Sequence, residues 1–109
     1  MVAVLPPGQV MVDVEGVSLK PNELTRLRHP HVGGVILFAR NFDSREQLTQ
    51  LCAEIHAARS EPLLIAVDHE GGRVQRFKSD GFTPLPCMQR FGEIWEDDSL
   101  AAMRLATET

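Results

Sequence analysis

The densest group of residues with usable chemistry lies at positions 68–76, which read DHEGGRVQR. Two carboxylates, an imidazole, two glycines and two arginines occur within these nine residues. They follow the apolar run LLIAV at positions 63–67, whose continuous hydrophobicity is typical of a buried strand. The glycines allow tight turns and close approach of a ligand, and each arginine offers a planar, charged set of donors. The composition is that of a binding or catalytic rim.

Several kinds of site are compatible with these residue types. Asp68 could accept hydrogen bonds from substrate hydroxyls, or it could bind backbone amides of its own loop. Asp68, His69 and Glu70 could hold a metal, but no further ligand follows at a convincing spacing. The two carboxylates could act as acid and base, although close neighbours on one strand end do not flank a bond being broken. Arg73 and Arg76 could bind substrate or pair with a nearby carboxylate.

The elements that would position this rim alternate between strands and helices. Apolar runs predict strands at residues 10–12, 35–38 and 63–67, with the glycines at 33–34 forming a turn into the second strand. Such strands, alternating with helices, predict a parallel sheet covered on both faces.

Two helices are predicted between these strands and one after them. The first begins at Pro21, a residue suited to the first helical turn. The second runs from about Ser44 to Arg59, because Ser44 and Gln47 form a capping-box signature. Residues 78–97 are expected to be rich in loops, and a further helix is expected to follow them.

Two parallel architectures fit this order, an open doubly wound sheet and an eight-stranded βα barrel. The nucleotide-binding fingerprints of doubly wound sheets are missing, so no nucleotide cofactor is expected. A barrel needs about 250 residues, so we expect this chain to be the N-terminal part of one. Ligand sites in both architectures lie at the C-terminal ends of strands, where Asp13, Arg40, Asn41 and Asp68 fall.

Composition excludes several function classes. The chain has 109 residues, 43% of them hydrophobic, and a formal net charge of −4. Because no basic cluster stands out, nucleic acid is not an expected partner. No apolar run approaches the length of a membrane span, and residues 1–8 do not resemble a signal peptide. Cys52 and Cys87 are expected to be free thiols, as in a reducing cytoplasm.

Three segments carry a resemblance to a known family. They are GGVILFARNF at residues 33–42, AVDHEGGRVQRF at residues 66–77 and GFTPLP at residues 81–86. With these motifs the chain resembles glycoside hydrolase family 3, and within it the cytoplasmic bacterial β-N-acetylglucosaminidases of peptidoglycan recycling. The match runs from about Val10 to the last residue.

The resemblance implies the N-terminal portion of an α/β fold, a (β/α)8 TIM-type barrel with parallel strands, formed as a single domain that continues beyond residue 109. It implies a retaining, metal-independent and cofactor-free glycosidase that removes terminal β-linked N-acetylglucosamine from fragments of the GlcNAc-anhydro-MurNAc type. Asp68 and Arg76 correspond to family residues that bind the terminal sugar. The family's nucleophile and its histidine acid and base lie beyond this chain, so no catalytic residue is assigned within it.

Two other function classes remain as alternatives at this point. One is a sugar-binding or assembly module made of half a barrel, which should oligomerise or aggregate through its open sheet edges. The other is a barrel enzyme acting on a phosphorylated or carbonyl substrate, whose phosphate loops would come from later strands. The quoted motifs argue against the second.

Overall fold

A computed structural model of the chain describes residues 8–109. The expectation that residues 1–8 are not a signal peptide therefore falls almost entirely outside the described residues. The chain divides into two compact units, the first ending at Asp68 and the second beginning at His69. Each unit is described by itself.

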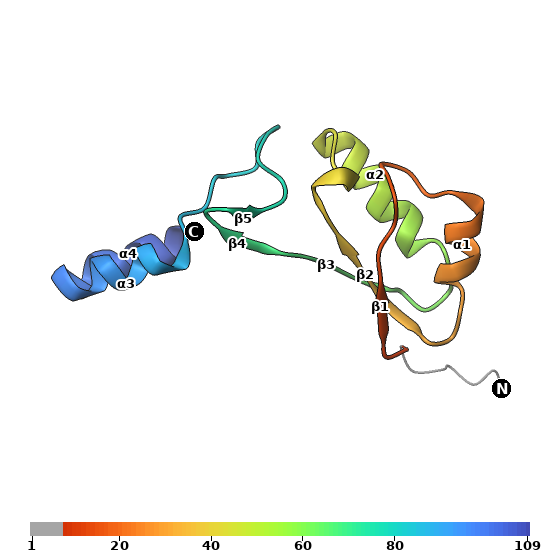
Figure 1. The fold of residues 1–109 in the computed structure, drawn as a ribbon, viewed down its shortest axis with the longest axis horizontal. Coiled ribbons are helices and arrows are strands. Elements are labelled where there is room, and N and C mark those ends of the chain that lie inside the picture. Colours follow the sequence, from red (N-terminus) through yellow and green to blue (C-terminus); the bar gives the residue numbers. More distant parts are fainter. Residues whose placement is uncertain (1–7) are drawn as a thin grey trace. The chain divides into compact units, whose positions relative to one another are not determined.

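The first unit is a three-stranded parallel sheet in the order β1-β2-β3, with one α-helix in each crossover (Figure 1). The elements are β1 (Val10–Val12), α1 (Pro21–Leu27), β2 (Val32–Leu37), η1 (Ala39–Asn41), α2 (Arg45–His56) and β3 (Leu64–Val67). The predicted strand–helix–strand–helix–strand order is thus confirmed.

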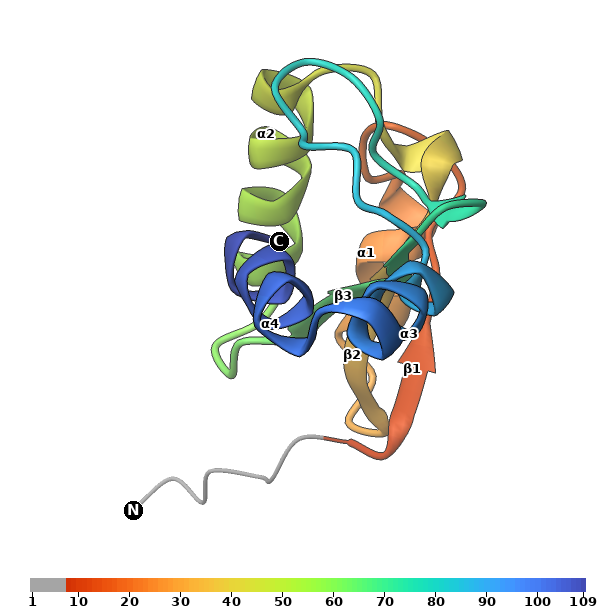
Figure 2. The ribbon, with the colours of Figure 1, turned by 90° about the vertical axis from the view of Figure 1, so that its left-hand side faces the viewer.

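Both helices of the first unit lie on the same side of its sheet (Figures 1 and 2). This follows from the strand order, because two successive right-handed crossovers that advance in one direction place their helices on one face. The prediction of a sheet covered on both faces is wrong for this unit. The steady advance from β1 to β3 is the pattern of a barrel rather than that of a doubly wound sheet, in which the direction reverses.

Side-chain alternation explains the core of the first unit. Val35 and Leu37 are 0% and 2% exposed, and they belong to the same core as Leu27, Leu51 and Ile55 of the two helices. Leu64 pairs with Gly34 on the other face and is 64% exposed. The third strand was predicted to be buried, but Leu64 is exposed and the rest of β3 is only half-buried.

The second strand begins earlier than predicted. Gly33 and Gly34 are strand residues within β2, not a turn that precedes it. A Cβ atom on Gly33 would lie 1.9 Å from the carbonyl oxygen of Gly8, and one on Gly34 would lie 3.0 Å from the Met11 side chain. Glycine is therefore needed at position 33, where neighbouring backbone approaches closely, whereas the end of the Met11 side chain beside Gly34 can move.

The predicted start of α2 is confirmed by its hydrogen bonds. Ser44 accepts from the backbone N–H of Gln47 at 3.1 Å, and the Gln47 side chain accepts in return from Ser44 at 3.4 Å. Gln47 also donates to the carbonyl oxygen of Val17 at 2.8 Å. The cap thus ties the start of α2 to the loop after β1.

The second unit consists of a short antiparallel hairpin and two helices that pack on each other. The elements are β4 (His69–Gly71), β5 (Val74–Gln75), α3 (Met88–Asp97) and α4 (Ser99–Glu108). The loop prediction for residues 78–97 is wrong in its second half. Apolar residues from Met88 onward recur at helical spacing, but Gly92 lowers the helical propensity and Cys87 supplies no side-chain cap.

Substitution of Gly92 by alanine should stabilise the protein. Gly92 lies inside α3, and a Cβ atom there meets nothing within 4 Å. Because alanine restricts the unfolded chain and favours helix, the free energy of unfolding should rise by about 0.5–1 kcal/mol. Urea titration of Gly92→Ala measures this. Gly16→Ala is the control, since Gly16 has equal room but lies outside any helix. A destabilised Gly92→Ala protein would contradict the helix assignment.

Candidate functional site at the strand ends

Polar residues follow all three strands of the first unit at the same edge of its sheet. Asp13 comes directly after β1, Arg40 lies in η1 after β2, and Asp68 comes directly after β3. Because the strands are parallel, their C-terminal ends share one edge. The sequence predicted that these three residues lie at the C-terminal ends of strands, and the structure confirms this position for each of them.

The structure brings Asp13 and Arg40 into contact. Arg40 donates from Nη2 to Asp13 Oδ2, and the two side chains keep 46% and 54% of their surface exposed. The guanidinium also lies over the ring of Phe38, with 4.8 Å between Cζ and the ring centroid. Arg40 is therefore held from two directions at the end of the sheet.

Asp68 ends the first unit with its side chain half-buried. Val67, the residue before it, pairs with Leu37, which faces the helices and is 2% exposed. Side chains alternate along an extended chain, so Asp68 belongs with Ala66 and Leu64 on the face that the helices leave open. In a barrel this is the interior face.

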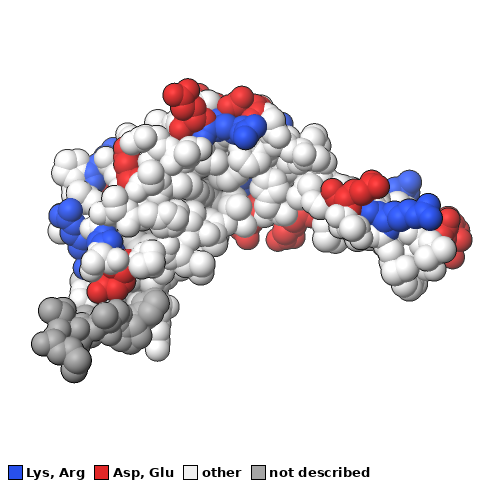
Figure 3. All heavy atoms as spheres, turned by 180° about the vertical axis from the view of Figure 1, so that it is seen from behind, with Lys and Arg blue, Asp and Glu red and all other residues white. Residues whose placement is uncertain are grey.

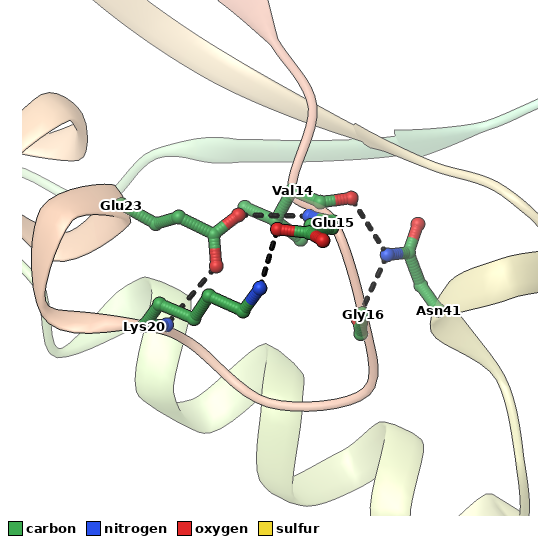
Figure 4. A network of polar contacts seen from close by, with 6 residues as sticks. All are labelled: Val14, Glu15, Gly16, Lys20, Glu23 and Asn41. Atoms are coloured by element: carbon green, nitrogen blue, oxygen red, sulfur yellow. Dashed lines mark hydrogen bonds and ion pairs between the residues drawn. The ribbon is translucent and has the colours of Figure 1, made fainter.

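Asn41 connects the loops that follow β1 and β2 (Figure 4). Its side chain is fully buried and donates from Nδ2 to the carbonyl oxygens of Val14 at 2.9 Å and Gly16 at 2.8 Å. Its Oδ1 accepts from the backbone N–H of Phe38 at 2.8 Å. The structure therefore gives Asn41 the role of anchoring these two loops.

Glu23, in the first turn of α1, also holds loop backbone through hydrogen bonds of a buried side chain. Sequence reasoning did not single it out. It is 3% exposed and accepts from the backbone N–H groups of Lys20 at 3.0 Å and Glu15 at 2.8 Å (Figure 4). A glutamate two residues after Pro21 is the signal that could have revealed this cap. Lys20 also hydrogen-bonds the Glu15 side chain, which lowers the pKa of Glu15 and raises that of Lys20.

Arg76 belongs to the second unit and directly follows β5. The residue before it, Gln75, is 4% exposed and fixes the loop beyond. Gln75 donates to the carbonyl oxygens of Phe77 and Thr83, each at 3.0 Å, and accepts from the backbone N–H of Leu85 at 2.8 Å. The backbone around Arg76 is therefore held by hydrogen bonds of the buried Gln75 side chain.

The two glycines of the 68–76 run are required by the hairpin. Gly71 and Gly72 have φ angles of +85° and +59°, which side chains disfavour. A Cβ atom on Gly71 would lie 2.0 Å from the carbonyl oxygen of Pro86, and one on Gly72 would lie 2.8 Å from Cys87 Cβ. The sequence suggested clearance for a ligand, whereas the structure shows clearance for residues 85–87.

His69, at the start of β4, lies among aromatic rings. Its ring centroid is 5.9 Å from that of Phe77 and 6.3 Å from that of Phe82.

Among residues 8–109 no group of three or more potential ligands could hold a metal ion. In the same range no helix has the length and apolarity to cross a bilayer.

Charged residues of both signs are mixed on the surface. On the face drawn in Figure 3, basic and acidic side chains are interspersed, and several groups contain both. This agrees with the total of 11 Lys and Arg against 15 Asp and Glu.

Both cysteines, Cys52 and Cys87, are free thiols, and burial raises the pKa of the Cys52 thiol.

The family model described as the glycosyl hydrolase family 3 N terminal domain matches residues 8–109. The chain belongs to glycosyl hydrolase family 3. It is 69% identical over 107 residues to a beta-hexosaminidase of Bordetella avium. That alignment covers 98% of this chain and 31% of the relative, so the chain spans about a third of the relative's length.

Similar solved structures extend the similarity to the fold. NagZ from Neisseria gonorrhoeae, crystallised with a zinc ion, is 53% identical with a TM-score of 0.86, and the alignment covers 93% of this chain and 30% of NagZ. The same NagZ with N-trifluoroacetyl-D-glucosamine is 54% identical with a TM-score of 0.85, covering 90% of this chain and 28% of NagZ. The fold is therefore the N-terminal portion of a TIM-type barrel with parallel strands, as predicted.

Proposed function

We propose that the protein containing these 109 residues is a β-N-acetylglucosaminidase. It removes terminal, non-reducing β-linked N-acetylglucosamine from peptidoglycan fragments of the GlcNAc-anhydro-MurNAc type, and it works in the cytoplasm during recycling of the cell wall. The observation that carries the proposal is the 69% identity to a beta-hexosaminidase over nearly the whole chain. The N-trifluoroacetyl-D-glucosamine bound by the gonococcal NagZ supports the choice of sugar.

In the proposed mechanism this chain supplies recognition rather than bond breaking. Asp68 accepts hydrogen bonds from hydroxyls of the terminal sugar, and Arg76 donates to the same sugar. An aspartate nucleophile and a histidine acid and base, both outside residues 1–109, give retention through a covalent glycosyl intermediate. No metal or cofactor takes part. The strand-end position of Asp68 supports its role, because barrel enzymes bind ligands at that edge.

Hydrolysis by the full-length protein tests the proposal. It should cleave a chromogenic β-N-acetylglucosaminide, and proton NMR should show that the sugar first appears as the β-anomer. The 109-residue chain alone should give no turnover, because it contains neither proposed catalytic group. A full-length protein that releases no N-acetylglucosamine would refute the activity. Release of the α-anomer would refute retention, and turnover by the 109-residue chain would refute the division of roles.

A further inference from the structure

A polar hollow lies beside the first turn of α1, at the edge of the sheet where the strands end. Its volume is about 270 Å³. We call it the rim pocket, and its polar lining consists of Asp13, Glu15, Asn22, Glu23, Arg26 and Arg40. All of these residues belong to the first unit, and none is assigned a role by the proposed function.

The Asp13–Arg40 pair gives the rim pocket directional hydrogen-bonding groups. A guanidinium has five N–H donors, and Arg40 uses one nitrogen, Nη2, to bind Asp13. About half of each side chain is exposed. The ring of Phe38 supports one face of the guanidinium. Outward-facing donors and acceptors are thus fixed side by side, which suits neighbouring hydroxyls of a sugar ring.

The other groups in the lining include charged side chains of both signs and an amide. Glu23 is buried and accepts from two backbone N–H groups, so it is already satisfied. Glu15 is bound by Lys20 and Asp13 by Arg40. Arg26 adds a further guanidinium. Asn22 adds an exposed amide. A ligand with many hydroxyls therefore meets both donors and acceptors here.

The rim pocket is too far from Asp68 to hold the same sugar ring. Asp13 follows β1 and Asp68 follows β3, and β2 lies between them. Neighbouring strands are about 4.8 Å apart, so these strand ends are separated by about 10 Å. A ligand that reaches both places must contain more than one ring.

We propose that the rim pocket binds the sugar on the leaving-group side of the substrate through the Asp13–Arg40 pair. The proposal rests on the proposed function, which places the terminal sugar at Asp68. Asn41 holds the pair in position, because it binds Val14, the residue after Asp13, and itself follows Arg40. The pocket therefore distinguishes substrates by what lies beyond the scissile bond.

Two substrates of the full-length protein separate sugar binding from a structural role. One is the neutral β-1,4-linked disaccharide of N-acetylglucosamine, and the other is a chromogenic N-acetylglucosaminide with a small aromatic leaving group. Arg40→Gln should lower kcat/KM for the disaccharide by about 10- to 100-fold, chiefly through KM, since a charge-assisted hydrogen bond is lost. For the chromogenic substrate kcat/KM should stay close to that of the wild type, because its leaving group has no hydroxyls.

Arg90→Gln is the matched control, because Arg90 forms a comparably exposed ion pair with Glu93 at 3.2 Å in the second unit. It should leave kcat/KM for both substrates unchanged. Equal losses for both substrates in Arg40→Gln would overturn the proposal, and so would no loss for either. A wild-type protein that cleaves only the chromogenic substrate would also overturn it while leaving the proposed function intact. Inactivity on both substrates would refute the proposed function and the pocket together.

Discussion

Asp68→Ala in the full-length protein should lower kcat/KM for a chromogenic β-N-acetylglucosaminide by about 30- to 1000-fold. This corresponds to roughly 2–4 kcal/mol of lost transition-state stabilisation, the range expected when a charged hydrogen-bond acceptor for the substrate is removed. Asp68 lies outside any helix or strand and follows a strand whose pairing with β2 does not depend on its side chain. The far-ultraviolet circular dichroism and the Tm should therefore change little.

Asp97→Ala serves as the control for this experiment. Asp97 is an exposed carboxylate at the end of α3, where a negative charge is not favoured by the helix dipole. The variant should keep the kcat/KM of the wild type. An Asp68→Ala protein with unchanged kcat/KM would show that Asp68 only bonds its own loop, the other role that its position allows. A large fall in Tm would point to the same conclusion.

The parts of the fold that sequence predicted well are those set by local signals. The strands at β1 and β3 follow from continuous apolar runs, and α2 follows from the pairing of Ser44 with Gln47 over three residues. Asp68 could be found because a carboxylate directly after a buried run lies at a strand end. These inferences need no knowledge of distant contacts.

The parts that sequence missed depend on contacts between distant residues. Arg40 meets Asp13 across 27 residues, and Asn41 bonds Val14 across the same separation. No periodicity encodes such pairs. The hairpin of β4 and β5 was missed because its strands are too short for a pattern to emerge, and its glycines face residues 85–87 of the same unit. The rim pocket was missed for the same reason, because it is lined by Asp13 and Arg40, which are distant in the sequence.

Asn41→Asp should lower the free energy of unfolding of the full-length protein by about 3–4 kcal/mol. The substitution keeps the shape of the side chain and removes both N–H donors. It then places a carboxylate oxygen against the carbonyl oxygens of Val14 and Gly16, which lie 2.9 Å and 2.8 Å from Nδ2 in the wild type. One buried and one partly buried acceptor lose their partners and a charge is buried beside them, which accounts for the size of the effect.

Urea unfolding followed by circular dichroism measures the change, and Asn22→Asp is the matched control. Asn22 is exposed in the first turn of α1, where an added negative charge is neutral or slightly stabilising. A comparable loss in both variants would mean that the added charge, and not the buried amide, sets the stability. If Asn41→Asp alone is destabilised, the loops after β1 and β2 depend on one side chain. Activity on the disaccharide should then fall with the stability, because those loops carry Asp13 and Arg40.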